Sequence, residues 1–201
     1  MNKIEHLVLH GVAIKKYAEP DSISEIIALP SETVEKVVES TTARGQIVSV
    51  GGKVTLSPAG KLILANGYSR FYADIRANEE FINAYERFEK INVELKALIT
   101  AWQVRPIGGA TIANDHSDKG YDDKIIDRLG ELHERAEQVL AALSDVLPRM
   151  QVYRDKLMTA LERAEDGAIE WVSDAKIESY HTLWFELHED LLCMLGHERQ
   201  E

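Results

Sequence analysis

Residues 29–60, "LPSETVEKVVESTTARGQIVSVGGKVTLSPAG", contain the strongest local signals in the chain. Apolar residues in the first part follow the spacing of one helical face. They are Val34, Val37, Val38 and Thr41. Ser31 is expected to cap this helix, because its hydroxyl can accept from the unpaired amides of the first turn. Gly45 is expected to end it.

Two short β-branched runs follow, separated by Gly51 and Gly52. A two-residue loop needs positive φ angles, and a glycine pair supplies them without steric cost. We therefore predict a β-hairpin around these glycines. Directly after it, Ser57 is a suitable N-cap, and Pro58 suits the first position of a new helix.

Two further helices are predicted upstream. The first has apolar residues at Ile4, Leu7, Val8 and Val12 and stops before "AEPD". The second is short, with Ile23, Ile26 and Ile27 on one face and Asp21 or Ser22 as its cap. Helix, short helix, tight turn, amphipathic helix and hairpin form the order of a winged helix-turn-helix, with the hairpin as the wing.

A long helix is predicted downstream, with residues at alternating steps of four and three. They are Phe81, Tyr85, Phe88, Asn92, Leu95, Ile99 and Trp102. Such a seam indicates either packing within the chain, which we favour, or a dimeric coiled coil with Asn92 fixing its register. Residues 103–121 are predicted to be irregular, and three helices should follow over about 121–146, 148–166 and 174–196.

The predicted fold is therefore mainly α. Residues 1–76 form a winged helix-turn-helix, and residues 77–201 form a helical bundle for dimerisation and ligand sensing. The net charge of −11 is unevenly distributed between these parts: residues 1–76 carry nine basic and eight acidic side chains, against fourteen and twenty-six in the remainder. An asymmetry of this size is typical of two parts with different roles.

Composition also bears on the cellular setting. No segment approaches the ~20 apolar residues that span a bilayer, and the N-terminus has no signal-peptide cleavage pattern. Cys193 is the single cysteine, which excludes an internal disulfide and suits a cytoplasmic protein. Its apolar neighbours favour a structural thiol over a nucleophile.

The outward side of the helix that begins at Ser31 is the candidate DNA-reading surface, because a recognition helix enters the major groove with its exposed face. The candidate contacts on this helix and the wing are Ser31, Thr33, Lys36, Ser40, Arg44 and Lys53. Glu32 and Glu39 share the surface and oppose an approach to phosphate, so affinity should be modest for each copy. A winged helix used for protein docking is the alternative.

The C-terminal stretch "SYHTLWFELHEDLL" places Tyr180, Leu183, Leu187, Leu191 and Met194 on one stripe. His181, Trp184 and His188 run beside it, and Glu186, Glu189 and Asp190 are expected to face solvent. Three interpretations remain open: structural histidines bonded to carboxylates, an effector pocket, or a metal site. The histidines are seven residues apart, about 10 Å along a helix, which disfavours one shared metal.

For the effector pocket, the candidate residues come from this helix, from the loop that contains "NDHSDKGYDD" and from the end of the long helix. They are Trp102, Asn114, His116, Tyr180, His181, Trp184 and His188. No phosphate-binding glycine loop, nucleophile elbow or H-E-x-x-H motif is present. We therefore predict no catalytic residues, no metal and no cofactor.

The stretches "LPSETVEKVVESTTARGQIVSV" and "LSPAG" resemble MarR-type winged-helix regulators. The stretches "NDHSDKGYD" and "SYHTLWFELHEDLL" resemble an uncharacterised helical domain that follows such a winged helix, alone or appended to pyruvate phosphate dikinase-like proteins. The resemblance carries no catalytic motif and implies a regulator or an accessory module, not an enzyme.

Together these features predict a cytoplasmic, homodimeric transcriptional regulator that binds double-stranded DNA and responds to a small-molecule effector, with no membrane contact. A ligand held by the bundle would reposition the long helix and thereby change the spacing of the two DNA-reading helices. The alternative is a regulatory or docking module for a phosphoenolpyruvate-utilising enzyme.

Overall fold

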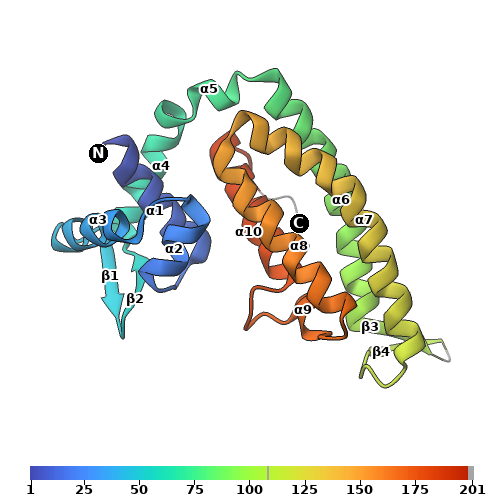
Figure 1. Ribbon diagram of the computed structural model, residues 1–201. Helices are drawn as coiled ribbons and strands as arrows, with labels where there is room; N and C mark the ends of the chain where they lie inside the picture. The colour runs from blue at the N-terminus through green and yellow to red at the C-terminus, as the bar shows by residue number, and fades with distance from the viewer. Residues whose placement is uncertain (108, 199–201) are drawn as a thin grey trace. The chain divides into compact units, whose positions relative to one another are not determined.

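The computed structural model describes residues 1–107 and 109–198 and divides into two compact units (Figure 1). The first contains residues 1–78 together with the chain from Glu186 onward, and the second contains residues 79–185. The division near residue 78 lies close to the predicted boundary. The return of the C-terminal residues to the first unit has no counterpart in the sequence prediction, and it means that one helix belongs to both units.

The first unit consists of helices and one hairpin. Its elements are α1 (Lys3–Lys15), α2 (Pro20–Ile27), α3 (Ser31–Ala43), β1 (Ile47–Val50), β2 (Lys53–Leu56), α4 (Pro58–Phe71), α5 (Ala73–Arg76) and the C-terminal part of α10 (Tyr180–Leu195). The order of helices and strands matches the prediction. The core contains the three predicted isoleucines of α2, which are at most 2% exposed.

The hairpin has the predicted turn. β1 and β2 are antiparallel, with Ile47 opposite Leu56 and Val50 opposite Lys53. Gly51 and Gly52 have φ angles of 59° and 81°, as a two-residue hairpin loop requires. On the other side of β2, an isolated bridge joins Val54 to Ala18. The segment between α1 and α2 therefore adds one pair of residues to the sheet.

Two helix caps differ from the prediction. Pro30, not Ser31, is the N-cap of α3, and Ser31 is the first helical residue. The hydroxyl of Ser24 donates to a backbone carbonyl, so the Ser31 hydroxyl, 3.1 Å away, donates to Ser24 instead of accepting from an amide. Likewise α2 begins at Pro20, before Asp21 and Ser22, because proline is preorganised for the first helical turn.

The second unit is a helical bundle with a second small hairpin. Its elements are α6 (Glu79–Gln103), β3 (Val104–Ile107), β4 (Ala110–Ala113), α7 (Lys119–Val146), the 3₁₀ helix η1 (Pro148–Met150), α8 (Gln151–Glu165), α9 (Glu170–Ser173) and the N-terminal part of α10. Helices α6 and α7 run side by side (Figure 1). The whole seam of α6, from Phe81 to Trp102, is at most 9% exposed. Packing within the chain therefore occupies the seam, and the coiled-coil alternative has no free seam to use.

Two predictions for the second unit were wrong. The stretch predicted to be irregular contains the antiparallel pair β3 and β4. The last helix begins at Tyr180, six residues later than expected, because the preceding residues form α9 and a turn. In that turn the Asp174 carboxylate accepts from the Lys176 amide, a local bond that competes with helix formation.

The prediction of a mainly helical chain is confirmed. Within residues 1–107 and 109–198, none of the helices combines the length and apolar character that crossing a membrane requires.

The hairpin base depends on a close approach between α4 and the residue before β1. Ser57 accepts from the Gly60 amide and donates to the Gly45 carbonyl. A Cβ on Gly60 would lie 2.0 Å from the carbonyl oxygen of Gln46. This is a backbone atom that cannot rotate away, so only glycine fits.

Gly60→Ala should therefore lower the free energy of unfolding by about 3 kcal/mol, as overpacking against rigid backbone does. Gly120→Ala is the matched control. Its nearest neighbour would be a side-chain oxygen at 3.7 Å, so it should be neutral or slightly stabilising. Urea denaturation of both variants measures the difference, and equal midpoints would contradict the packing explanation.

His6 of α1 is a buried neutral imidazole. Its side chain is 1% exposed and lies against the rings of Tyr68, Phe71 and Tyr72. Its Nε2 donates to the Leu64 carbonyl at 3.3 Å. Burial, together with the nearby His10, lowers the pKa of His6 to about 4.

Acid should therefore destabilise the first unit. In the unfolded chain His6 takes up a proton near its ordinary pKa of 6.5, whereas the folded chain does so only near 4. Stability is unaffected above pH 6.5 and falls below it, by at most about 1.4 kcal/mol per pH unit, until the folded pKa is reached. His6→Phe should remove this component from pH-dependent urea midpoints. If the urea midpoint of His6→Phe falls with decreasing pH as steeply as that of the wild type, His6 is not the cause of the acid sensitivity. His197→Gln, at an exposed position, is the control.

Candidate functional site

The first candidate site is the outer side of α3 together with the wing. Ser31, Lys36 and Ser40 are exposed on α3, and Thr33 is half-buried. Arg44, the residue directly after α3, is exposed as well. Lys53 is half-buried at the start of β2. The predicted contacts are thus accessible from solvent.

The basic groups of this surface are already engaged within the protein. Lys36 Nζ lies 2.5 Å from Glu32 Oε1, one turn earlier on α3. Arg44 lies 2.8 Å from Glu5 of α1 and lowers the pKa of that carboxyl. The Lys53 ammonium lies over the ring of Tyr17, 5.5 Å from its centroid. A polyanion would have to displace these internal partners.

The second candidate site is a cavity of about 420 Å³ in the second unit. The walls are formed by the end of α6, the loop after β4, and the segment around α9. The lining residues are Trp102, Gln103, Asn114, His116, Ile169, Glu170, Ser173 and Asp174. A volume of this size suits a small molecule.

A saturated hydrogen-bond network fixes the ring of His116 at the cavity. The Asn114 amide nitrogen lies 3.0 Å from the Trp102 carbonyl and 2.8 Å from Asp122 Oδ1. Those two acceptors use both of its protons, so its 3.2 Å contact with His116 Nδ1 is not a hydrogen bond. The other Asp122 oxygen, 3.0 Å from His116 Nδ1, only accepts, so Nδ1 carries a proton. In the neutral imidazole Nε2 is then an acceptor.

The backbone at His116 is held in an unusual conformation. Its φ angle is 58°, in the left-handed region that non-glycine residues seldom occupy. The imidazole packs against Trp102, with the ring centroids 4.5 Å apart, and the His116 amide donates to the side chain of Asn114. Such strain persists only where the surroundings determine it, and it is concentrated at functional sites.

Among the predicted ligand contacts, Trp102, Asn114 and His116 therefore line one cavity. His181 lies beside it, with Nδ1 3.3 Å from the hydroxyl of the lining residue Ser173. Burial lowers the pKa of His181, which favours its neutral form. Sequence reasoning missed the lining residues of α9, because their approach to the loop after β4 is a tertiary contact with no local pattern.

The other predicted residues have different surroundings. Tyr180 is fully buried and bonds to His133 at 3.0 Å. Trp184 is 3% exposed, stacks on Phe88 and donates to Asn92. These residues belong to the core of the second unit and not to the cavity lining.

His188 and its neighbours on α10 belong to the first unit. His188 is buried, and so are Glu186 and Asp190, which were predicted to face solvent. Glu186 lies 2.9 Å from Lys15 of α1, and Asp190 lies 2.8 Å from His10. The helical wheel failed here because α1 covers a side of α10 that local hydrophobicity marked as exposed.

Neither site has the arrangement of a metal centre or of an activated thiol. Within the part of the chain that the structure describes, no group of three or more His, Cys, Asp or Glu side chains could hold a metal ion. Cys193 is half-buried, and burial raises the pKa of its thiol to about 11, so the nucleophilic thiolate is scarce at neutral pH.

Comparison with models of protein families, with curated proteins and with solved structures gave no match.

Asn114→Ala should destabilise the second unit by about 1–3 kcal/mol, because Asp122 Oδ1 and the Trp102 carbonyl would lose the donor that Asn114 supplies. Ser117→Ala, on an exposed side chain of the same loop, should change stability little. Nitrogen NMR of the wild-type His116 ring should find the proton on Nδ1. A proton on Nε2, or equal stability of the two variants, would contradict the network.

Proposed function

We propose that this protein is a cytoplasmic transcriptional regulator whose first unit binds double-stranded DNA as a winged helix-turn-helix and whose second unit holds a small-molecule effector. The observation that carries the proposal is the arrangement of the first unit. Helix α3 follows α2 after a tight turn, its outer side is exposed, and the β1–β2 hairpin follows directly. The bridge between Ala18 and Val54 completes the small sheet that such a unit contains.

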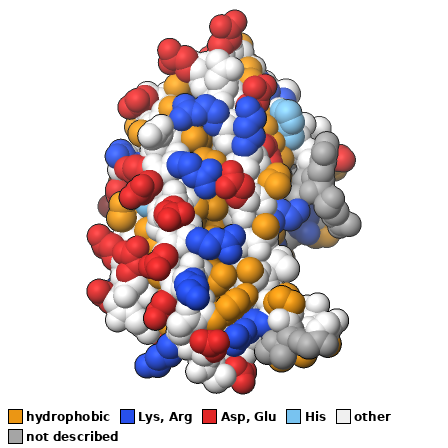
Figure 2. All heavy atoms as spheres, turned by 90° about the vertical axis from the view of Figure 1, so that its right-hand side faces the viewer, with side chains coloured by type: hydrophobic (Ala, Val, Ile, Leu, Met, Phe, Trp, Pro, Cys, Tyr) orange, Lys and Arg blue, Asp and Glu red, His pale blue; other side chains and the backbone are white. Residues whose placement is uncertain are grey.

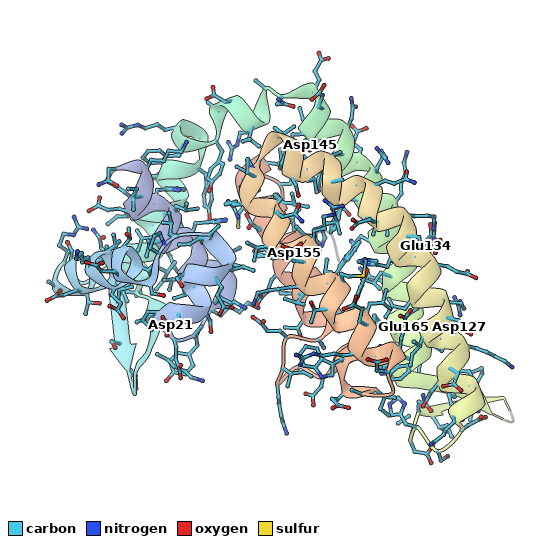
Figure 3. The ribbon with its side chains drawn as sticks, in the orientation of Figure 1. Asp21, Asp127, Glu134, Asp145, Asp155 and Glu165 are labelled. Atoms are coloured by element: carbon cyan, nitrogen blue, oxygen red, sulfur yellow. The ribbon has the colours of Figure 1, made fainter. Side chains whose placement is uncertain are left out.

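Charge supports contact through the first unit in preference to the second. Exposed carboxylates occur along both α7 and α8 of the second unit, as Figure 3 shows for Asp127, Glu134, Asp145, Asp155 and Glu165. Figure 2 shows the side of the molecule on which α6 and α7 lie in Figure 1, and there basic and acidic side chains are interleaved. DNA binding needs basic groups gathered on one surface.

Lys36 can exchange its internal partner for phosphate. It and Glu32 are 71% and 78% exposed, and an ion pair so open to water contributes little to stability. The Glu32 carboxylate that pairs with Lys36 also repels the phosphates of DNA. Neutralising Glu32 should therefore strengthen DNA binding, whereas a purely structural role for α3 predicts no such effect.

A dimer would double the DNA contacts of one copy. The seam of α6 cannot form it, since those side chains are buried within their own chain. The dimer contact would have to use another surface.

A protein-docking role for the same unit is the second candidate. It is favoured by the pairing of Lys36 and Arg44 with carboxylates and by two apolar side chains on the wing, Val48 and Val50, which are 44% and 58% exposed. A docking surface tolerates neutralised charge and uses exposed apolar groups. Such a role would leave the protein without salt-dependent DNA binding.

DNA binding is tested by fluorescence anisotropy with duplexes from the region upstream of the protein's own gene, at two salt concentrations. Lys36→Gln should weaken binding and reduce the salt slope by about 1, because the variant neutralises one phosphate fewer than the wild type. Glu32→Gln should tighten binding.

Lys96→Gln, an equal charge change at an exposed position of α6, is the matched control and should have little effect. If Lys96→Gln weakens DNA binding as much as Lys36→Gln does, α3 is not the DNA-reading helix. The same conclusion follows if no duplex shows salt-dependent binding, and the docking role then takes the place of DNA binding.

A further inference from the structure

We propose that the cavity in the second unit binds a small organic cation, such as an amine, amidine or guanidine. This inference deepens the sensor part of the proposed function and rests on it for its biological purpose. The binding itself is independent of DNA.

The charge of the lining is the first reason. Glu170 and Asp174 bring two carboxylates to the cavity, and its lining residues include no lysine or arginine. Within residues 1–107 and 109–198, neither carboxylate forms an ion pair. An anion entering here would approach two negative charges without a compensating cation, whereas a cation would meet two favourable partners.

The hydrogen-bonding groups give a second, independent reason. The network of Asn114 and Asp122 fixes the proton on His116 Nδ1, which leaves Nε2 as an acceptor in the neutral ring. The carboxylates of Glu170 and Asp174 accept as well. A ligand that complements these groups must bring donors, and ammonium and guanidinium groups are donors without an acceptor.

Hydrogen bonds connect the lining of the cavity to α10. Gln103 lies 3.4 Å from the hydroxyl of Ser173, and the same hydroxyl contacts His181 of α10. A ligand that bonds to Gln103 or Ser173 alters the partners of His181. Binding at the cavity is thus connected to α10 through a single hydroxyl group.

The test is isothermal titration calorimetry on the full chain without DNA, at low salt. The probes are 1,4-diaminobutane, agmatine and histamine, compared with 1,4-butanediol and succinate. Butanediol and succinate keep the four-carbon span of 1,4-diaminobutane, but the first carries no charge and the second carries two negative charges. The three cations should bind, and butanediol and succinate should not.

The variants then locate the site. The double variant Glu170→Gln with Asp174→Asn should weaken binding roughly ten-fold, since neutral amides at these exposed positions cannot form charge-assisted hydrogen bonds to the cation. Glu162→Gln, an exposed carboxylate of α8 outside the lining, should leave the affinity unchanged.

Binding of succinate or butanediol as tight as that of the diamine would overturn the proposal. So would equal weakening in the double variant and the control, or no binding of any of the three cations at millimolar concentration. Failure of the anisotropy experiment would reject DNA binding and leave this result intact, because calorimetry uses no DNA.

Discussion

The carboxylate of Asp190 lies in the interior of the first unit, and the position of the last helix depends on its bond to His10. The two side chains are 1% and 0% exposed, and their atoms are 2.8 Å apart. Since the carboxylate only accepts, His10 Nε2 carries the proton, and Nδ1 of a neutral ring accepts from the Tyr68 hydroxyl at 2.7 Å. Burial raises the pKa of Tyr68 and so keeps its proton in place. A buried carboxylate without such partners is strongly destabilising, so a shift of α10 that separated Asp190 from His10 would be costly.

This constraint gives α10 a second role. Its C-terminal part bonds to α1 through Asp190 and Glu186, while its N-terminal part packs in the second unit through Tyr180 and Trp184. In the same N-terminal part, His181 contacts the hydroxyl of the cavity-lining residue Ser173. The proposed ligand would therefore lie beside a residue of the helix that also contacts α1.

The parts of the fold that the sequence predicted well are those specified locally. Gly51 and Gly52 favour a hairpin turn because they lie between two β-branched runs, and Ser57 followed by Pro58 favours the start of a helix. The order of the first unit follows from such signals. The seam of α6 was also correct in its residues, although periodicity alone could not say whether its partner was the same chain.

The errors share a physical cause, which is that polar residues were assigned to solvent or to a site by their local pattern. Asp190 and Glu186 lie on the polar side of α10 by that pattern, yet basic partners on α1, about 180 positions away in the sequence, make their burial possible. His116 and Asn114 were correctly grouped because they are close in sequence. Glu170 and Asp174 were missed because only the folded bundle brings them to the same cavity.

The distribution of charge bears on the proposed DNA binding. At physiological salt, charges separated by more than about 8 Å are largely screened, so the total of −11 matters less than the groups at the contact surface. From Ser31 to Leu56 the chain carries Lys36, Arg44 and Lys53 against Glu32, Glu35 and Glu39. A neutral surface gains little from counterion release, and its binding energy must come from hydrogen bonds to base edges. The proposed DNA binding would then discriminate between sequences, because non-specific attraction, which every duplex shares, would contribute little to the affinity.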